Sequence, residues 1–184
     1  MKNLKLIALL VIPTLFSTSC SNDDSAVNED EVITTITTTL IGGGQTITLT
    51  SRDADGDGPN APIVTVSGNL VAGTTYSGST TFVNELANPS EDITEEIALE
   101  GADHQVFYQL PSTVGTLTYT DTDESGKPIG LNFTLVTGSA GTTGTLIVTL
   151  RHLPNKSASG VAAGDITNAG GNTDAAVTFP IEVN

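Results

Sequence analysis

Residues 32–52 read VITTITTTLIGGGQTITLTSR, and this stretch decides the fold class. Threonine, valine and isoleucine dominate on both sides of a glycine triplet at 42–44, and this composition is typical of two strands joined by a turn. In residues 45–52, Ile47 and Leu49 alternate with threonines, so one face is apolar and the other polar. The stretch therefore predicts two successive β-strands that bury only one face.

The same composition continues to the C-terminus, with Gly, Asn, Asp and Pro between the apolar runs. Further strands are predicted at 63–67, 75–83, 105–110, 115–120, 131–136, 145–151 and 175–183. Because no long amphipathic helix interrupts them, we expect an all-β fold, a single immunoglobulin-like antiparallel β-sandwich of about 8–9 strands over residues 32–184. Its predicted core comprises Val32, Ile36, Ile47, Leu49, Val64, Val66, Phe82, Val106, Tyr108, Leu117, Leu131, Phe133, Leu146, Val148, Leu150, Val177 and Phe179.

The segment 91–103 allows two predictions. Ser90 is a suitable N-cap for a helical turn that opens with Glu91 and Asp92, since both carboxylates favour the positive end of the helix dipole. The segment also suits an edge strand, whose charges discourage pairing with another chain.

The N-terminus has the pattern of a bacterial lipoprotein signal. Lys2 and Lys5 precede an apolar stretch at 6–15, which is too short to span a bilayer, and small residues lead to Cys20. We expect residues 1–19 to be a signal peptide, Cys20 to be the lipidation site, and residues 20–31 to form an acidic tether. Two or more acyl chains would anchor the protein stably in the membrane.

Composition excludes several classes of function. The chain of 184 residues has 21 acidic and 6 basic side chains, a formal net charge of −15, no tryptophan and one cysteine. Nucleic acid is excluded as a partner, because its phosphates require lysine and arginine. A single cysteine forms no internal disulfide and no cysteine-built zinc site.

The sequence DADGDGPN at 53–60 is a candidate calcium loop. Asp53, Asp55 and Asp57 alternate before a glycine, and hard carboxylate oxygens suit Ca²⁺. An EF-hand is excluded, because Val64 stands where the bidentate glutamate belongs. The alternative is a solvated acidic turn, with Arg52 as the nearest neutralising cation.

The two histidines suggest a second metal site. His104 follows a run of acids that includes Glu96, and His152 directly follows a predicted strand. If the strands place His104 and His152 side by side, these residues with Glu96 would form a zinc or copper site. The alternative is a surface histidine in an acidic segment.

Motifs for catalysis are missing. The acidic segment 121–127 predicts a hairpin loop, and Ser125-Gly126-Lys127 lacks the upstream glycines of a phosphate-binding loop. No G-x-S-x-G elbow occurs, and the only thiol is that of Cys20. We therefore expect a protein that is not an enzyme.

Several segments resemble a family of small, uncharacterised flavobacterial lipoproteins of the Bacteroidetes. They are DADGDGPNAPIV (53–64), LVAGTTYSGSTTFVNE (70–85), EDITEEIALEGADHQVFY (91–108), LRHLPNKS (150–157) and ITNAGGNTDAAVTFPIEV (166–183). The acidic run after Cys20 also resembles the export tag of surface lipoproteins in that phylum. The resemblance implies an outer-membrane, cell-surface location, with the periplasmic face as the alternative. Some members are labelled "type 1 periplasmic-binding fold", a larger α/β architecture, whereas this sequence predicts a sandwich.

Two hypotheses about function follow. In the first, the protein is a non-catalytic binding module that holds a divalent cation or a nutrient for a neighbouring outer-membrane transporter. In the second, it is a structural or adhesive surface module with a calcium-stabilised loop. In both, the lipid on Cys20 provides the contact with the membrane.

Overall fold

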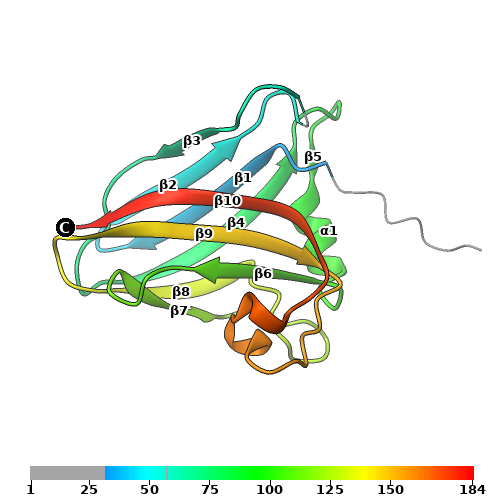
Figure 1. Ribbon diagram of the computed structural model, residues 1–184. Helices are drawn as coiled ribbons and strands as arrows, with labels where there is room; N and C mark the ends of the chain where they lie inside the picture. Colours follow the sequence, from blue (N-terminus) through cyan, green and yellow to red (C-terminus); the bar gives the residue numbers. More distant parts are fainter. Residues whose placement is uncertain (1–31, 57) are drawn as a thin grey trace, which may run out of the picture.

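The computed structural model describes residues 32–56 and 58–184 of the chain (Figure 1). Its strands are β1 (Thr35–Gly42), β2 (Gln45–Arg52), β3 (Ile63–Val66), β4 (Thr75–Asn84), β5 (Glu91–Asp92), β6 (His104–Gln109), β7 (Gly115–Tyr119), β8 (Asn132–Thr137), β9 (Thr142–His152) and β10 (Asn172–Val183). A short helix, α1 (Ile93–Leu99), precedes β6, and two 3₁₀ turns, η1 (Val161–Ala163) and η2 (Ile166–Asn168), precede β10. Each of the nine predicted strands is present.

The strands form two antiparallel sheets that pack as a sandwich (Figure 1). The larger sheet has the order β3-β2-β1-β4-β8-β7, with β5 paired to β4, and the smaller sheet has the order β10-β9-β6. The residues around Leu70 join the sheets, because the Leu70 N–H donates to the Glu182 carbonyl oxygen and the Asn184 N–H donates to the Leu70 carbonyl oxygen. The all-β, immunoglobulin-like sandwich expected from the sequence is confirmed.

The hairpin that opens the domain follows from its glycines. Gly42 pairs with Gln45, so Gly43 and Gly44 alone form the turn between β1 and β2. Their φ angles are 59° and 76°, a left-handed conformation that a two-residue hairpin turn of this type requires and that glycine adopts without strain.

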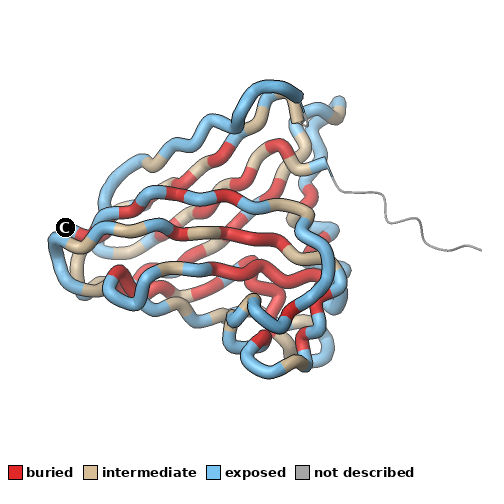
Figure 2. The backbone as a smooth tube through the Cα atoms, viewed as in Figure 1, coloured by how far each residue is buried: buried red, intermediate tan, exposed pale blue. Residues whose placement is uncertain are grey.

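The main core lies between the sheets, where buried residues of β1, β2, β4 and β10 alternate with more exposed ones, many of them threonines, while β6 is buried on both faces (Figure 2). Most of the predicted core is buried, and Val66 and Leu117 are partly buried against it. Two predictions are wrong: Val32 is 48% exposed because it precedes β1, and Val64 is 40% exposed. Val64 lies on β3, an edge strand of the larger sheet, where the three-stranded sheet gives little cover.

The ambiguous segment forms both a strand and a helix. Glu91 and Asp92 pair with the end of β4, and α1 begins directly afterwards. Asp92 is the N-cap, since its carboxylate accepts a hydrogen bond from the Thr94 N–H at 3.0 Å, so the prediction of Ser90 as the cap is wrong. Ile93 and Ile97 stand four residues apart and both pack into the core.

A chain of buried hydroxyls crosses the core and connects the two sheets. Thr38 Oγ1 lies 2.8 Å from Thr80 Oγ1, and Tyr108 Oη lies 2.7 Å from both Thr80 Oγ1 and the Gly130 carbonyl oxygen. Thr38 and Thr80 belong to the larger sheet, whereas Tyr108 belongs to β6 of the smaller one. The cost of burying these polar groups is offset because each forms a hydrogen bond inside the core.

Replacing Tyr108 with phenylalanine is expected to destabilise the domain by about 1–3 kcal/mol, because buried hydroxyl and carbonyl groups lose a partner. Urea unfolding measures this loss. Tyr119→Phe is the matched control: its hydroxyl donates to the Val106 carbonyl oxygen, but the residue is only partly buried. An equal loss in both variants would contradict a special role for the hydroxyl chain.

Candidate functional site

The two histidines lie side by side at one end of the smaller sheet. His104 is the first residue of β6, His152 is the last residue of β9, and the two form a directly opposed pair in the antiparallel register. Their rings are stacked, with centroids 4.8 Å apart and planes inclined by 9°. The condition that the sequence set for a histidine metal site, a meeting of these two residues, is therefore fulfilled.

Asp174 completes a cluster with the two histidines. One ligand atom from each of His104, His152 and Asp174 lies within 4.8 Å of the others. Asp174 lies on β10, where the pairing with β9 shifts between Thr173 and Ala175. Such a β-bulge inserts an extra residue and re-aims side chains, and bulges are common beside functional sites.

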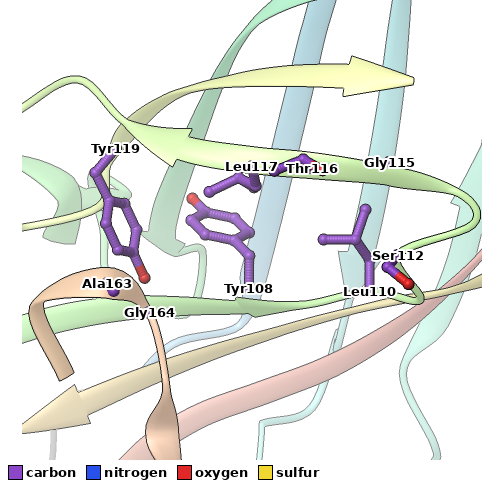
Figure 3. Close-up of a pocket in the computed structure, with 9 residues that line it drawn as sticks. All are labelled: Tyr108, Leu110, Ser112, Gly115, Thr116, Leu117, Tyr119, Ala163 and Gly164. Carbon is purple, nitrogen blue, oxygen red and sulfur yellow. The ribbon is translucent and has the colours of Figure 1, made fainter. Parts of the chain in front are cut away.

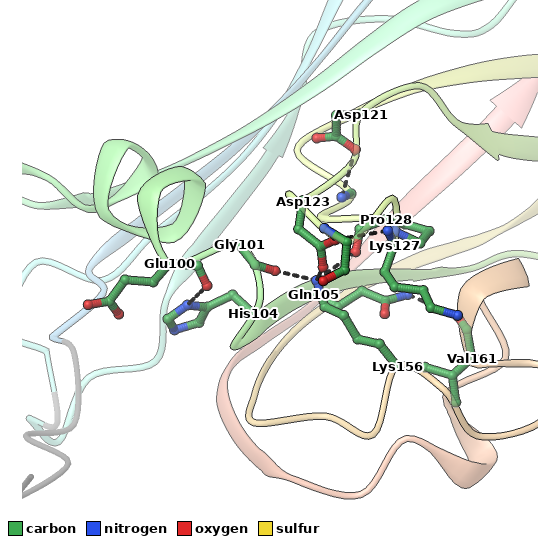
Figure 4. Close-up of polar contacts among 12 residues, drawn as sticks. Glu100, Gly101, His104, Gln105, Asp121, Asp123, Lys127, Pro128, Lys156 and Val161 are labelled. Atoms are coloured by element: carbon green, nitrogen blue, oxygen red, sulfur yellow. Dashed lines mark hydrogen bonds and ion pairs between the residues drawn. The ribbon is translucent and has the colours of Figure 1, made fainter.

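The surroundings of His104 define which of its ring nitrogens is the hydrogen-bond donor. His104 is 1% exposed, and its Nδ1 lies 3.2 Å from the Glu100 carbonyl oxygen, just beyond α1 (Figure 4). Because a carbonyl oxygen only accepts hydrogen bonds, Nδ1 is the donor, and in the neutral ring the lone pair is then on Nε2. A backbone carbonyl in this role is the usual outer-shell partner of a metal-binding histidine.

The backbone beside His152 is tightly constrained. Leu153 adopts a φ of 52°, which is uncommon for a residue other than glycine, and its N–H donates to the Asp103 carbonyl oxygen at 2.6 Å. Gly171 has a φ of 69°, and a Cβ at this position would collide with the His152 carbonyl oxygen. Unusual backbone conformations of this kind concentrate at functional sites.

Two imidazoles and one carboxylate form a donor set suited to zinc, copper and related divalent ions. Zinc binds these donors at about 2.0–2.2 Å. To share one ion, the three ligand atoms must therefore come closer together than the 4.8 Å within which they lie here. The lone pair of a ring nitrogen lies in the plane of its ring, and the two ring planes are inclined by only 9°, so to share one ion the half-buried His152 ring must turn out of the stack toward Asp174.

Glu96 does not belong to this cluster. It lies on the exposed side of α1, and the acid that the fold brings to the histidines is Asp174 in place of the expected Glu96. Asp174 directly precedes the strand predicted at 175–183, so the alternating pattern did not predict on which face of the sheet its side chain lies.

The aspartate loop after β2 hydrogen-bonds within itself. Asp53 accepts a hydrogen bond from the Asp55 N–H, and Asp55 accepts one from Asn60 Nδ2 at 2.5 Å. The bond from Asn60 lowers the pKa of Asp55 below its usual range. Within the described residues, no metal-ligand cluster includes Asp53 or Asp55, and Asp57 lies outside the described residues. The calcium loop therefore stays a prediction.

Arg52 does not neutralise that loop, as the sequence suggested. Its guanidinium instead pairs with Glu85 at 2.6 Å, across the end of the larger sheet. The pair holds the pKa of Glu85 below its usual range, since Arg52 donates a hydrogen bond to that carboxylate. Both side chains are solvent-exposed, so the pair contributes little to stability.

The acidic segment 121–127 forms the expected loop, but its central carboxylate has a partner that the sequence did not reveal. Asp123 Oδ2 lies 3.0 Å from Lys156 Nζ, and the two side chains are 3% and 6% exposed (Figure 4). Lys156 Nζ also donates to the carbonyl oxygens of Gly101 and Pro128. This buried ion pair connects three loops and leaves Asp123 committed to a structural role.

A groove lies between β6 and β7, apart from the histidine cluster (Figure 3). It has a volume of about 230 Å³, and Tyr108, Leu110, Leu117 and Tyr119 line it together with small residues. Burial raises the pKa of Tyr119 to about 12, so its hydroxyl stays protonated at neutral pH. None of the lining side chains is charged at neutral pH, so the groove lacks the imidazole and carboxylate donors of the histidine cluster.

Comparisons with protein-family models, with curated proteins and with solved structures find no match for this chain. Cys20 and the signal-peptide and tether segments, 1–19 and 20–31, lie outside the described residues. In the part of the chain that the structure describes, no helix is long and apolar enough to cross a membrane.

Proposed function

We propose that the protein is a lipid-anchored, non-catalytic module of the outer membrane that binds a divalent transition-metal ion through His104, His152 and Asp174. The observation that carries this proposal is the meeting of these three side chains from three neighbouring strands. Zinc and copper are the ions that this donor set favours. The module would hold the ion for an outer-membrane transporter beside it.

Two further features support binding at this position. The Glu100 carbonyl oxygen orients the His104 ring, and the β-bulge of β10 lies at Asp174. Outer-shell partners that orient a ligand are characteristic of metal sites. The acidic composition of the chain, with a net charge of −15, would also attract cations toward the module.

The experiment is thermal unfolding of the chain from residue 20 onward, carrying Cys20→Ser so that no thiol competes for the metal. Zinc or copper at about 100 times its dissociation constant should add about 2.7 kcal/mol of stability. For a domain of this size, that gain raises the Tm by roughly 5–10 °C. EDTA should reverse the shift.

Calcium provides the comparison between the two hypotheses. A shift with calcium alone, abolished by Asp55→Ala, would favour the structural module with a calcium-stabilised loop. No shift with zinc or copper would contradict the proposed function.

The anchor is tested separately in cells. We expect the wild-type protein to incorporate labelled palmitate and to fractionate with the outer membrane, because acyl chains provide stable attachment. Cys20→Ala should lose both the label and the membrane association. Protease treatment of intact cells then distinguishes the cell surface from the periplasmic face, and retention of Cys20→Ala in the membrane would contradict the anchor.

A further inference from the structure

We infer that a metal bound by His104, His152 and Asp174 keeps one coordination position open to solvent and takes a small external oxygen- or nitrogen-donor ligand there. This inference rests on the proposed function and adds the class of ligand that the bound metal accepts. A module of this kind would bind its ion as a complex with a small chelating molecule.

The number of ligands is the first argument. Within residues 32–56 and 58–184, the cluster offers three ligating side chains. Structural zinc sites are closed by four protein ligands, whereas sites that exchange ligands have three and leave the fourth position to water or to a bound molecule. The cluster therefore matches the open class of site.

Burial shows on which side the position opens. His104 is 1% exposed, so protein encloses the cluster on the side of β6. His152 and Asp174 are only partly buried, so solvent reaches the cluster from the β9–β10 side. A small molecule would approach from there.

Charge determines the ligand class. With neutral imidazoles, a divalent ion and the Asp174 carboxylate leave one net positive charge at the site. That charge favours a monoanion or a neutral nitrogen donor over a second cation. Carboxylate- or imidazole-bearing chelators fit this requirement, and they are also common ligands of these metals.

Asn172 provides a variant that should close the position. It lies directly opposite His152 in the pairing of β9 with β10, and it is exposed. Opposed residues of an antiparallel pair point to the same face, so Asn172→His would add an imidazole in the row of His104 and His152. Thr173→His is the matched control, because Thr173 is opposed to Arg151, the residue before His152, and therefore points to the other face.

The test loads the Cys20→Ser chain with copper(II), measures the copper affinity, and titrates azide as the external ligand. We expect a saturable azide-to-copper charge-transfer band with one azide per copper. Asn172→His should weaken azide binding by at least about tenfold, since copper(II) favours a square-planar set of four donors and a fourth protein ligand would take the place of azide. Thr173→His should bind azide as the wild type does.

The outcomes separate the two proposals. If copper binds but azide gives no band, the metal is fully ligated by protein, and the open position is refuted while the proposed function stands. Equal azide affinity in the wild type and Asn172→His would also refute it, because azide would then bind elsewhere. If neither copper nor zinc binds, the proposed function fails first.

Discussion

Replacing Lys156 with methionine is expected to destabilise the domain by about 3–5 kcal/mol, because the substitution leaves the buried Asp123 carboxylate without its counter-ion. The carbonyl oxygens of Gly101 and Pro128 lose a donor at the same time. Urea unfolding at neutral pH measures the loss. Lys127→Met is the matched control from the same region, and we expect it to stay within about 0.5 kcal/mol of the wild type.

A double variant tests whether the loss comes from the stranded charge. Asp123→Asn removes the charge but keeps an oxygen that can accept hydrogen bonds from the N–H groups of Ser125 and Lys127. The Asp123 carboxylate accepts these bonds in the wild type. Combined with Lys156→Met, it should therefore recover part of the lost stability, since contacting residues are not additive. A double variant less stable than Lys156→Met alone would contradict this explanation.

The pH dependence of the same pair has a defined sign. Burial alone would raise the pKa of Asp123, but the Lys127 N–H and the Lys156 ammonium hold this pKa below its usual range. The stabilisation is therefore present above the unfolded-state pKa of about 3.9 and is lost as the pH falls through the lower folded-state pKa. The penalty of Lys156→Met should accordingly shrink in acid.

The second large effect concerns the metal. Asp174→Asn should weaken zinc binding by more than the roughly 100-fold that loss of an outer-shell partner can cost, because it removes the only carboxylate ligand of the cluster. Calorimetric titration of the Cys20→Ser chain measures the affinity. Glu96→Gln is the matched control, since Glu96 lies outside the cluster, and it should bind zinc as the wild type does.

The reverse result would restore the ligand set expected from the sequence. If Glu96→Gln weakened binding and Asp174→Asn did not, α1 would have to supply the carboxylate. Thermal unfolding without metal must accompany the titration, so that a folding defect is not mistaken for a lost ligand.

The fold could be predicted because most of the long strands repeat the same local signal. Alternating residues such as Ile47 and Leu49 specify the buried face, and turns such as Gly43-Gly44 punctuate the strands. The exposure of Val64 was not predictable from this alternation. It depends on which strands lie at the edge of the larger sheet, and a period-two pattern carries no information about strand order.

The site could be predicted only in part. Histidines at the start of one strand and the end of another were visible, and their opposition followed from the β6–β9 pairing. The position of Asp174 beside them could not be predicted, because a bulge interrupts the alternation that assigns each residue to one face of the sheet. Lys156 was missed for another reason: lysines are almost never fully buried, and no local signal marks the exception.

The junction at Leu70 has a kinetic consequence. Residues 70–72 hydrogen-bond with residues 182–184, so this junction between the sheets forms only when segments more than a hundred residues apart in the chain have met. Pairing between such distant segments places folding of all-β domains in a range of about milliseconds to seconds. If the larger sheet assembles before this junction forms, its apolar face is exposed to aggregation for that time. The time during which this face is uncovered, more than any single contact, would then limit the yield of native protein.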